Sequence, residues 1–274
     1  MRPAGRRGVA VTGVLVVGAL GVLALLGPEL LAGSPTEIAR DQALRGPTLG
    51  EPFGMDDLGR SVLSGVVSAY RVSLGVALGS VALALLIGGP LGLVAGYAEG
   101  LPDQFIMRPL DVLMAFPAIL LSIALMSVFG TGVILVSAAL AVVYTPIVAR
   151  VVRGAVLAAK VEVYVDGARA LGATAPRLML GHILPNAATP VLVQASVLMA
   201  IAILVEASLS FLGVGVRPPT PSLGLMLADG RGFMLQAPWM VVFPGIAIMI
   251  AVLGFNMMAD GLRDWGDPQD TARR

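Results

Sequence analysis

The sequence predicts an all-α integral membrane protein with six transmembrane helices. Of its 274 residues, 57% are hydrophobic and only 13% are charged, and the mean hydropathy is +0.90. A soluble domain has about 25% charged residues, so this chain has too few charges to cover a water-exposed surface. Its long uncharged runs do not alternate as the strands of a membrane β-barrel do. Helices are therefore required, because each unpaired backbone group in lipid costs several kcal/mol.

The first predicted helix is the uncharged run from Gly8 to Pro28, which follows Arg2, Arg6 and Arg7. A signal peptide also has a basic start, but its apolar region is about 7–15 residues long. This run is longer and lacks a convincing small-x-small cleavage site. We therefore predict a retained transmembrane helix.

Five further spans are predicted from the remaining apolar runs. The run from Val112 to Ala149 is too long for one crossing, since about 20 residues suffice, and the glycines of "FGTG" (Phe129–Gly132) allow a hairpin that divides it. The five spans are Val72–Ala98, residues 112–128, residues 133–150, about Thr189–Leu212 and about Pro238–Met258.

Six spans place both termini on the same side of the membrane. Twelve of the 18 Lys and Arg residues then fall on the side of the termini, so the positive-inside rule predicts that both termini are cytoplasmic. Four regions follow: residues 1–31 (N-terminus and first helix), 32–71 (extracytoplasmic loop with an amphipathic segment), 72–260 (five-helix core, including a cytoplasmic loop over 151–188) and 261–274 (cytoplasmic tail).

The cytoplasmic loop between spans four and five contains "DGARALGATAPRLMLGHILPN", Asp166 to Asn186. We predict a helix over Val161–Leu171 that Gly172 ends in a left-handed conformation. A second short helix begins with Thr174 as N-cap and Pro176 in its first turn, and runs to about His182. Pro185 and Pro190 then lead into span five. The predicted shape is a compact helical knob outside the membrane.

This knob has two interpretations from its residues alone. Its arginines are typical of any cytoplasmic connector that obeys the positive-inside rule. A plain connector, however, needs no apolar residues, whereas a helix that docks in a partner's groove does. The apolar residues are Val165, Ala168, Leu171, Leu178, Met179 and Leu180.

The knob also carries a motif. Asp166-Gly167-Ala168, Gly172 and Leu184-Pro185 resemble the "EAA---G---------I-LP" loop of binding-protein-dependent ABC importer permeases. Within that family, the ending His-x-Leu-Pro-Asn resembles the dipeptide/oligopeptide/nickel branch. Three more stretches are similar to that branch: "FGMDDLGRSVLSGVVSAYRVSL", "RPLDVLMAFPAILLSIAL" and "EASLSFLGVGVRPPTPSLGLML". Asp166 and Gly167 depart from the usual Glu and Ala, and Gly in a helix interior costs about 1 kcal/mol against Ala.

The resemblance implies a type I ABC importer permease fold and a set of partners. In that family the loop forms coupling helices that sit in a groove of a separate ATPase subunit. The implied assembly has a second, similar permease, two ATPase subunits and an extracytoplasmic binding protein, in a bacterial cytoplasmic membrane. The implied substrates are di- or oligopeptides, or alternatively nickel or a metal chelate. The residues that match the coupling role are Asp166, Gly167, Ala168, Leu171, Gly172, Arg177, Leu184 and Pro185.

Several chemistries are not supported by the sequence. The only lysine, Lys160, is not preceded by the glycines of a G-x-x-x-x-G-K-[ST] phosphate loop. We therefore expect no cofactor on this chain, with ATP and Mg²⁺ held by the partner ATPase. There is no cysteine and one histidine, no aromatic-basic patch for nucleic acid and no catalytic triad spacing, so neither an enzyme nor a metal or nucleic-acid site is predicted.

Two polar residues lie within predicted spans. Glu206 interrupts span five, and Asn256 lies in span six. An ionisable group in a membrane segment is functional by default, so both are candidates for a translocation path or gate; a cap or an interhelical hydrogen bond is the alternative. A stand-alone secondary transporter would need inverted repeats and central acids, which are not evident. A membrane assembly protein is a third possibility.

Overall fold

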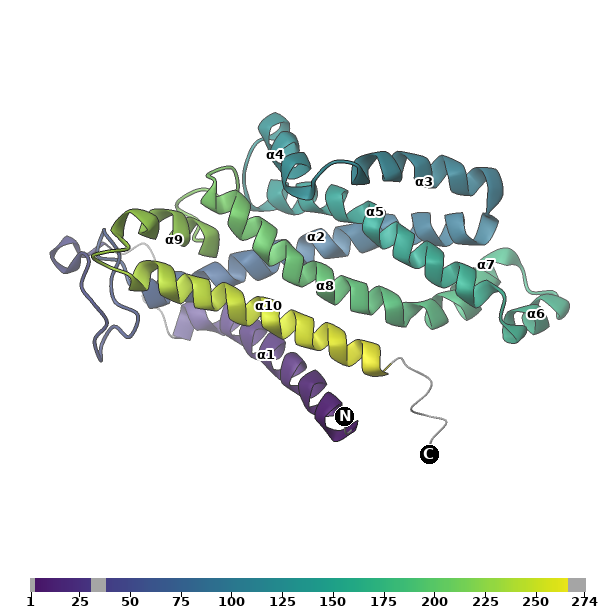
Figure 1. The fold of residues 1–274 in the computed structure, drawn as a ribbon, viewed down its shortest axis with the longest axis horizontal. Helices are drawn as coiled ribbons and strands as arrows, with labels where there is room; N and C mark the ends of the chain where they lie inside the picture. The colour runs from purple at the N-terminus through teal and green to yellow at the C-terminus, as the bar shows by residue number, and fades with distance from the viewer. Residues whose placement is uncertain (1–2, 31–37, 266–274) are drawn as a thin grey trace.

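The computed structural model describes residues 3–30 and 38–265, and it is a bundle of long helices with short helices at both ends (Figure 1). Its long helices are α1 (Pro3–Leu30), α2 (Val62–Ala98), α5 (Val133–Lys160), α8 (Leu184–Phe211) and α10 (Trp239–Trp265). Its shorter helices are α3 (Gly100–Met114), α4 (Ala118–Phe129), α6 (Val163–Ala170), α7 (Ala175–Leu178) and α9 (Leu223–Gly230).

Three single helical turns complete the described secondary structure, and these residues contain no strand longer than one bridge, Met55–Ser61. Arg40–Gln42 and Arg231–Phe233 are 3₁₀ turns, whereas Met179–Ile183 is a π turn. Residues 31–37, which include the start of the predicted extracytoplasmic loop, lie outside the described residues. So do residues 1–2 and the end of the predicted tail, residues 266–274, and with them Arg2, Arg273 and Arg274.

Five of the described helices are long and apolar enough to cross a membrane, and α3 with α4 forms a bent sixth candidate. This confirms the predicted all-α membrane fold. The prediction of a straight third helix over residues 112–128 is wrong, because the chain turns by 92° between α3 and α4. Pro117 explains the bend: its ring disfavours helical backbone at Phe116, and Pro117 itself is extended (ψ 131°) before α4 begins.

The other helices begin or end outside their predicted bounds. α2 starts ten residues before the predicted Val72, where Ser61 caps it by accepting a hydrogen bond from the Ser64 amide. α5 continues to Lys160, and α8 begins at Leu184. Helices therefore extend well past the apolar runs, because burial against neighbouring helices continues beyond the uncharged segments.

The centre of the bundle is a parallel contact between α2 and α5. Gly88, Gly92 and Gly96 form a stripe on α2, and their missing side chains leave room for α5. A methyl group on Gly88 would lie 2.6 Å from the Thr145 carbonyl oxygen, and one on Gly96 would lie 2.9 Å from the Arg153 carbonyl oxygen. Small residues allow membrane helices to approach this closely. α2 and α5 thus run side by side in the same direction.

α1 packs antiparallel to α10, with Gly13 against Met258 and Gly261 against Ala10. The start of α1 and the end of α10 therefore lie at the same end of the molecule (Figure 1). Below, the "α6 end" is where α2 and α5 end and α6 lies, and the "α9 end" is where α2 begins beside α9.

Candidate functional site

At the α6 end, residues 161–183 form a compact helical projection, here called the knob (Figure 1). Gly172 ends α6 with a φ of +82°, as predicted. The reversal is closed by backbone hydrogen bonds: the Gly172 amide donates to the Arg169 carbonyl (3.0 Å), and the Ala173 amide donates to the Ala168 carbonyl (3.1 Å). A left-handed residue at this position is the usual way to end a helix, and glycine adopts it without steric cost.

The second half of the knob differs from the prediction. Thr174 is at the N-cap position, but its side chain makes no capping bond, and Pro176 is in the first turn. The predicted short helix does not stop at His182; α7 passes through the π turn directly into α8. In the π turn the Leu184 amide donates to the Met179 carbonyl. A wider turn placed before Pro185 gives room for a ring that would clash in an α-helix.

The apolar residues of the knob divide into two groups. Val165 and Leu178 are buried, 0% and 1% exposed, so they hold the knob together and are not free to contact a partner as predicted. Leu171 is 91% exposed and Val163 is 85% exposed. These two apolar side chains, at the start and the C-cap of α6, are therefore accessible to a docking partner.

The residues predicted for coupling lie together on the knob and at the start of α8. Asp166, Gly167, Leu171, Gly172 and Arg177 are exposed on the knob. The Asp166 carboxylate accepts a hydrogen bond from Arg169 at 3.1 Å within α6, and 66% of its side chain remains exposed.

The remaining predicted residues are less prominent. Ala168 is half-buried, and Leu184 and Pro185 are exposed in the first turn of α8. His182 has no acidic partner among the described residues; its Nδ1 lies 3.3 Å from the Arg177 carbonyl oxygen, and its own carbonyl accepts from Asn186. These contacts are local and structural.

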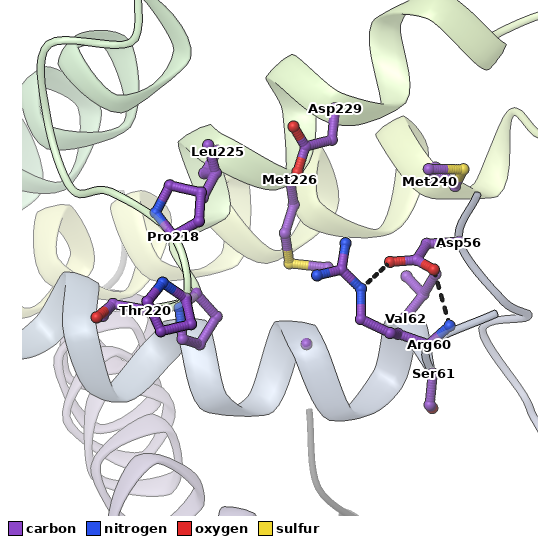
Figure 2. A pocket seen from close by; sticks show the side chains of 13 residues that line it. Asp56, Arg60, Ser61, Val62, Pro218, Thr220, Leu225, Met226, Asp229 and Met240 are labelled. Atoms are coloured by element: carbon purple, nitrogen blue, oxygen red, sulfur yellow. Dashed lines mark hydrogen bonds and ion pairs between the residues drawn. The ribbon is translucent and has the colours of Figure 1, made fainter. Parts of the chain in front are cut away.

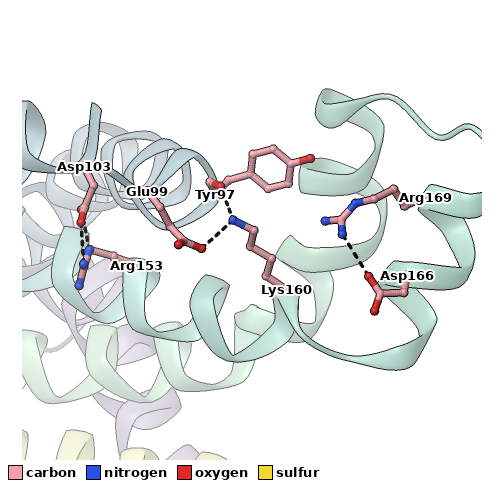
Figure 3. Close-up of polar contacts among 7 residues, drawn as sticks. All are labelled: Tyr97, Glu99, Asp103, Arg153, Lys160, Asp166 and Arg169. Carbon is pink, nitrogen blue, oxygen red and sulfur yellow. Dashed lines mark hydrogen bonds and ion pairs between the residues drawn. The ribbon is translucent and has the colours of Figure 1, made fainter. Parts of the chain in front are cut away.

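A row of ion pairs joins α5 to the segment where α2 passes into α3 (Figure 3). Arg153 makes two 2.6 Å bonds to the Asp103 carboxylate, and Lys160 makes a 2.7 Å bond to Glu99. A third pair joins Arg150 to Asp111.

These ion pairs were not predicted from the sequence. The paired residues lie 39, 50 and 61 positions apart in the chain, so no local sequence pattern predicts that they meet.

Glu206 is completely buried near the α9 end. Its two carboxylate oxygens accept hydrogen bonds from Ser73 of α2 (2.7 Å) and Ser210 of α8 (2.8 Å). Ser210 Oγ in turn accepts from the Val216 amide at 3.1 Å. This network ties α2, α8 and the following loop together. A role for Glu206 in a gate stays a prediction.

Asn256 is exposed on α10, and its side-chain amide donates to the Val252 carbonyl of the same helix at 2.9 Å. It makes no interhelical hydrogen bond among the described residues. A place for Asn256 on a translocation path stays a prediction.

A cleft of about 90 Å³ opens at the α9 end, beside the start of α2, the 218–221 proline turn and α9 (Figure 2). Arg60 lies in it with its Nε 2.6 Å from Asp56, which also accepts from the Arg60 amide. Asp229 lies across the cleft, and partial burial raises its pKa above the usual value despite the opposing effect of nearby Arg60. The cleft thus has a mostly apolar lining of Pro, Val, Leu and Met side chains, with charges of both signs among them.

Long apolar helices with a helical projection at one end define a multi-pass membrane protein. The chain belongs to the binding-protein-dependent transport system inner membrane component family, whose model matches residues 88–269. It is therefore a permease of an ABC transport system, as the resemblance of the knob motif implies.

Several relatives cover most of the chain. It is 41% identical over 260 residues to a dipeptide transport system permease protein, DppC, of Alkalihalophilus pseudofirmus, covering 95% of this chain and 86% of that one. It is 42% identical over 229 residues to a glutathione transport system permease protein, GsiD, of Pectobacterium atrosepticum, covering 84% and 76%.

A solved structure shares the fold. The MetNI methionine ABC transporter, in inward-facing conformations, matches with a TM-score of 0.57 and 17% sequence identity, over 72% of this chain and 96% of that one. At this identity the likeness concerns the fold alone. It confirms the predicted ABC importer permease fold.

Proposed function

We propose that this chain is the translocation subunit of an ATP-driven importer of di- or oligopeptides. The substrate class rests on the relatives named for dipeptides and glutathione, which match over most of the chain. No observation favours the nickel or metal-chelate alternative. Membership of a binding-protein-dependent family leaves no role for a secondary transporter that works alone.

The observation that carries the mechanism is the exposed apolar surface of the knob. Leu171 and Val163 point away from the bundle, while Val165 and Leu178 fix the knob to it. Such a surface is costly in water and is covered when a helix docks in a groove. We therefore place a separate ATPase at the knob, with the Asp166 carboxylate available for a basic residue of its groove. ATP and Mg²⁺ belong to that subunit.

The knob side of the molecule is then cytoplasmic, as are both termini, and the cleft at the α9 end faces outward. A binding protein delivers the substrate to that outer face, and a second permease completes the path. ATP-driven closure of the two ATPases moves the knobs as rigid bodies, and the helices switch between inward- and outward-facing arrangements.

The test is co-purification of the detergent-solubilised chain with its ATPase. We expect the wild-type chain to retain a subunit with a G-x-x-x-x-G-K-[ST] motif. Leu171→Asp places a charge on the apolar surface of the knob, and we expect it to lose the ATPase while its membrane insertion is unchanged. Leu49→Asp is the matched control, since Leu49 is also fully exposed but lies before α2.

A second variant tests the backbone reversal at Gly172. Gly172→Arg forces a large side chain into a left-handed backbone position, and we expect it to abolish both ATPase association and peptide uptake. If Gly172→Arg still co-purified with the ATPase and transported peptide normally, the knob would not be the coupling element. Calorimetric titration of peptides and nickel chelates onto the partner binding protein decides the substrate class.

A further inference from the structure

Lys160 joins the end of α5 to the corner between α2 and α3. It is the only lysine and the last residue of α5, directly before the knob. Its ammonium donates to the Tyr97 carbonyl oxygen at 2.6 Å and to the Glu99 carboxylate at 2.7 Å. It also lies 5.3 Å from the centre of the Tyr97 ring (Figure 3). Three contacts thus converge on one flexible side chain.

The acceptors belong to the corner where α2 ends and α3 begins. Tyr97 is in the last turn of α2, where carbonyl groups have no partner within the helix. Because α2 and α5 run in parallel, their negative ends lie close together, and a cation between them stabilises both. Glu99 turns the chain with a positive φ of 52°. Lys160 therefore holds the end of α5 against a sharp reversal of the backbone.

The Lys160 contact lies beyond the close contact between α2 and α5. The close glycine contact of α2 with α5 reaches Gly96, which lies against Arg153 and Val156. The last turn of α5, from Leu157 to Lys160, then carries the knob beyond that contact. Lys160 ties this turn back to α2 and α3.

We propose that Lys160 is a positioning residue that makes the knob and the α2–α3 corner move as one body. The inference rests on the proposed function, because the movement concerned is the one that a docked ATPase imposes on the knob. Without the ammonium, the knob still docks, but its displacement is absorbed in the last turn of α5. ATP is then hydrolysed while less peptide is transported.

The experiment uses the complete complex with its binding protein in proteoliposomes. For each variant, three quantities are measured: ATPase retained per permease, ATP hydrolysed and peptide taken up. We expect Lys160→Met to retain the ATPase and to lower peptide uptake per ATP about tenfold, a size typical of coupling between sites. Lys160→Arg keeps the charge and the donors, so we expect it to restore most of the ratio.

Arg108→Met is the matched control. Arg108 is an exposed cation of α3 at the same end, and it makes no ion pair within the described part of the chain. We expect its uptake per ATP to equal that of the wild type. Should Lys160→Met fail to fold, Glu99→Gln removes only the carboxylate partner and is expected to change the ratio in the same direction by a smaller factor.

A distance measurement separates positioning from general loss of activity. Because the chain has no cysteine, Leu101→Cys and Val161→Cys introduce the only two labelling sites, both at exposed positions on either side of the Lys160 contact. We expect spin labels there to give a narrow distance distribution that Lys160→Met broadens and Lys160→Arg restores.

Three results would overturn the inference: an unchanged uptake-to-ATP ratio in Lys160→Met, an unchanged distance distribution, or loss of the ATPase itself, which would make Lys160 part of the docking surface. None of these touches the proposed function. That function fails instead if the wild-type complex, with ATP and the binding protein, takes up no peptide.

Discussion

At the α9 end, the Glu206 carboxylate is fully buried and both of its oxygens accept hydrogen bonds from serine hydroxyls. At the α6 end, the Asp166 side chain is 66% exposed and bonds only to Arg169 of its own helix. The same contrast holds for apolar residues. Phe53 stacks on Phe243 at 4.0 Å near the α9 end, whereas Leu171 on the knob contacts mainly solvent.

The α9 end and the α6 end therefore differ in how easily their residues can move. Buried hydrogen bonds and close packing are expensive to break, because the separated groups find no water. Exposed ion pairs contribute at most about 1 kcal/mol each. The α9 end is therefore held by buried hydrogen bonds, whereas the exposed part of the knob around Asp166 and Leu171 is held less firmly. The following substitutions test that contrast, from the largest expected effect to the smallest.

The largest effect is expected for Gly224→Leu at the α9 end. A side chain at Gly224 would overlap the carbonyl group of Ala207, so α9 could not remain against α8. We expect a loss of about 3 kcal/mol of unfolding free energy, measured by thermal unfolding in detergent. Gly181→Leu is the matched control, because a side chain there meets open space. Equal unfolding temperatures for the two variants would remove the contrast.

A smaller effect is expected for Glu206→Leu. The substitution keeps the volume but leaves the Ser73 and Ser210 hydroxyls without their acceptor, at a cost of about 2 kcal/mol. Glu206→Gln retains an acceptor and should lose less. Unfolding curves of Glu206→Leu, Ser73→Ala and the double variant measure the coupling. Strict additivity of the two substitutions would contradict the network.

At the α6 end, Gly172→Ala is expected to cost roughly 1 kcal/mol, because alanine is strained at a left-handed φ. The loss should be confined to the knob. Hydrogen exchange should therefore quicken in α6 while the amides of α2 and α8 keep their protection. Gly172→Asn, which tolerates this conformation, should behave almost as the wild type. Faster exchange throughout the bundle would show that the knob is not a separate unit.

The smallest effect is an improvement. Gly167 lies inside α6, and a methyl group there meets no atom within 4 Å. Gly167→Ala should stabilise α6 by up to about 1 kcal/mol, since alanine is the better helix former. Slower hydrogen exchange over residues 163–170, with the global unfolding temperature unchanged, is the expected result. A drop in protection would mean that the glycine has a packing role.

Much of this fold could be predicted from local sequence. Long uncharged runs predict helices because lipid offers no other hydrogen-bond partner for the backbone. Gly172 predicts the end of α6 because glycine adopts a left-handed conformation without steric cost. The uncharged run over Val112–Ala149 predicts apolar helices but not the angle between them; the sequence signal for the bend is Pro117, which disfavours helical backbone at Phe116.

The site was predicted less completely, for a physical reason. An apolar residue on a short helix has the same pattern whether it faces its own bundle, as Val165 does, or solvent, as Leu171 does. The ion pairs of Lys160 and Arg153 depend on helices that meet only in three dimensions. The spacing of apolar residues therefore predicted the helices of the knob but not the contacts that hold the knob against the bundle.

The parallel contact of α2 with α5 has a consequence for how the chain is made. Gly88 contacts Thr145, which the ribosome adds 57 residues later. At about 5–20 residues per second, that delay is roughly 3 to 11 s. During it, the glycine face of α2 is already synthesised, while α3, α4 and the hairpin glycines must reverse the chain twice. The glycine face of α2 therefore stays without its α5 partner until the α3–α4 segment has been synthesised.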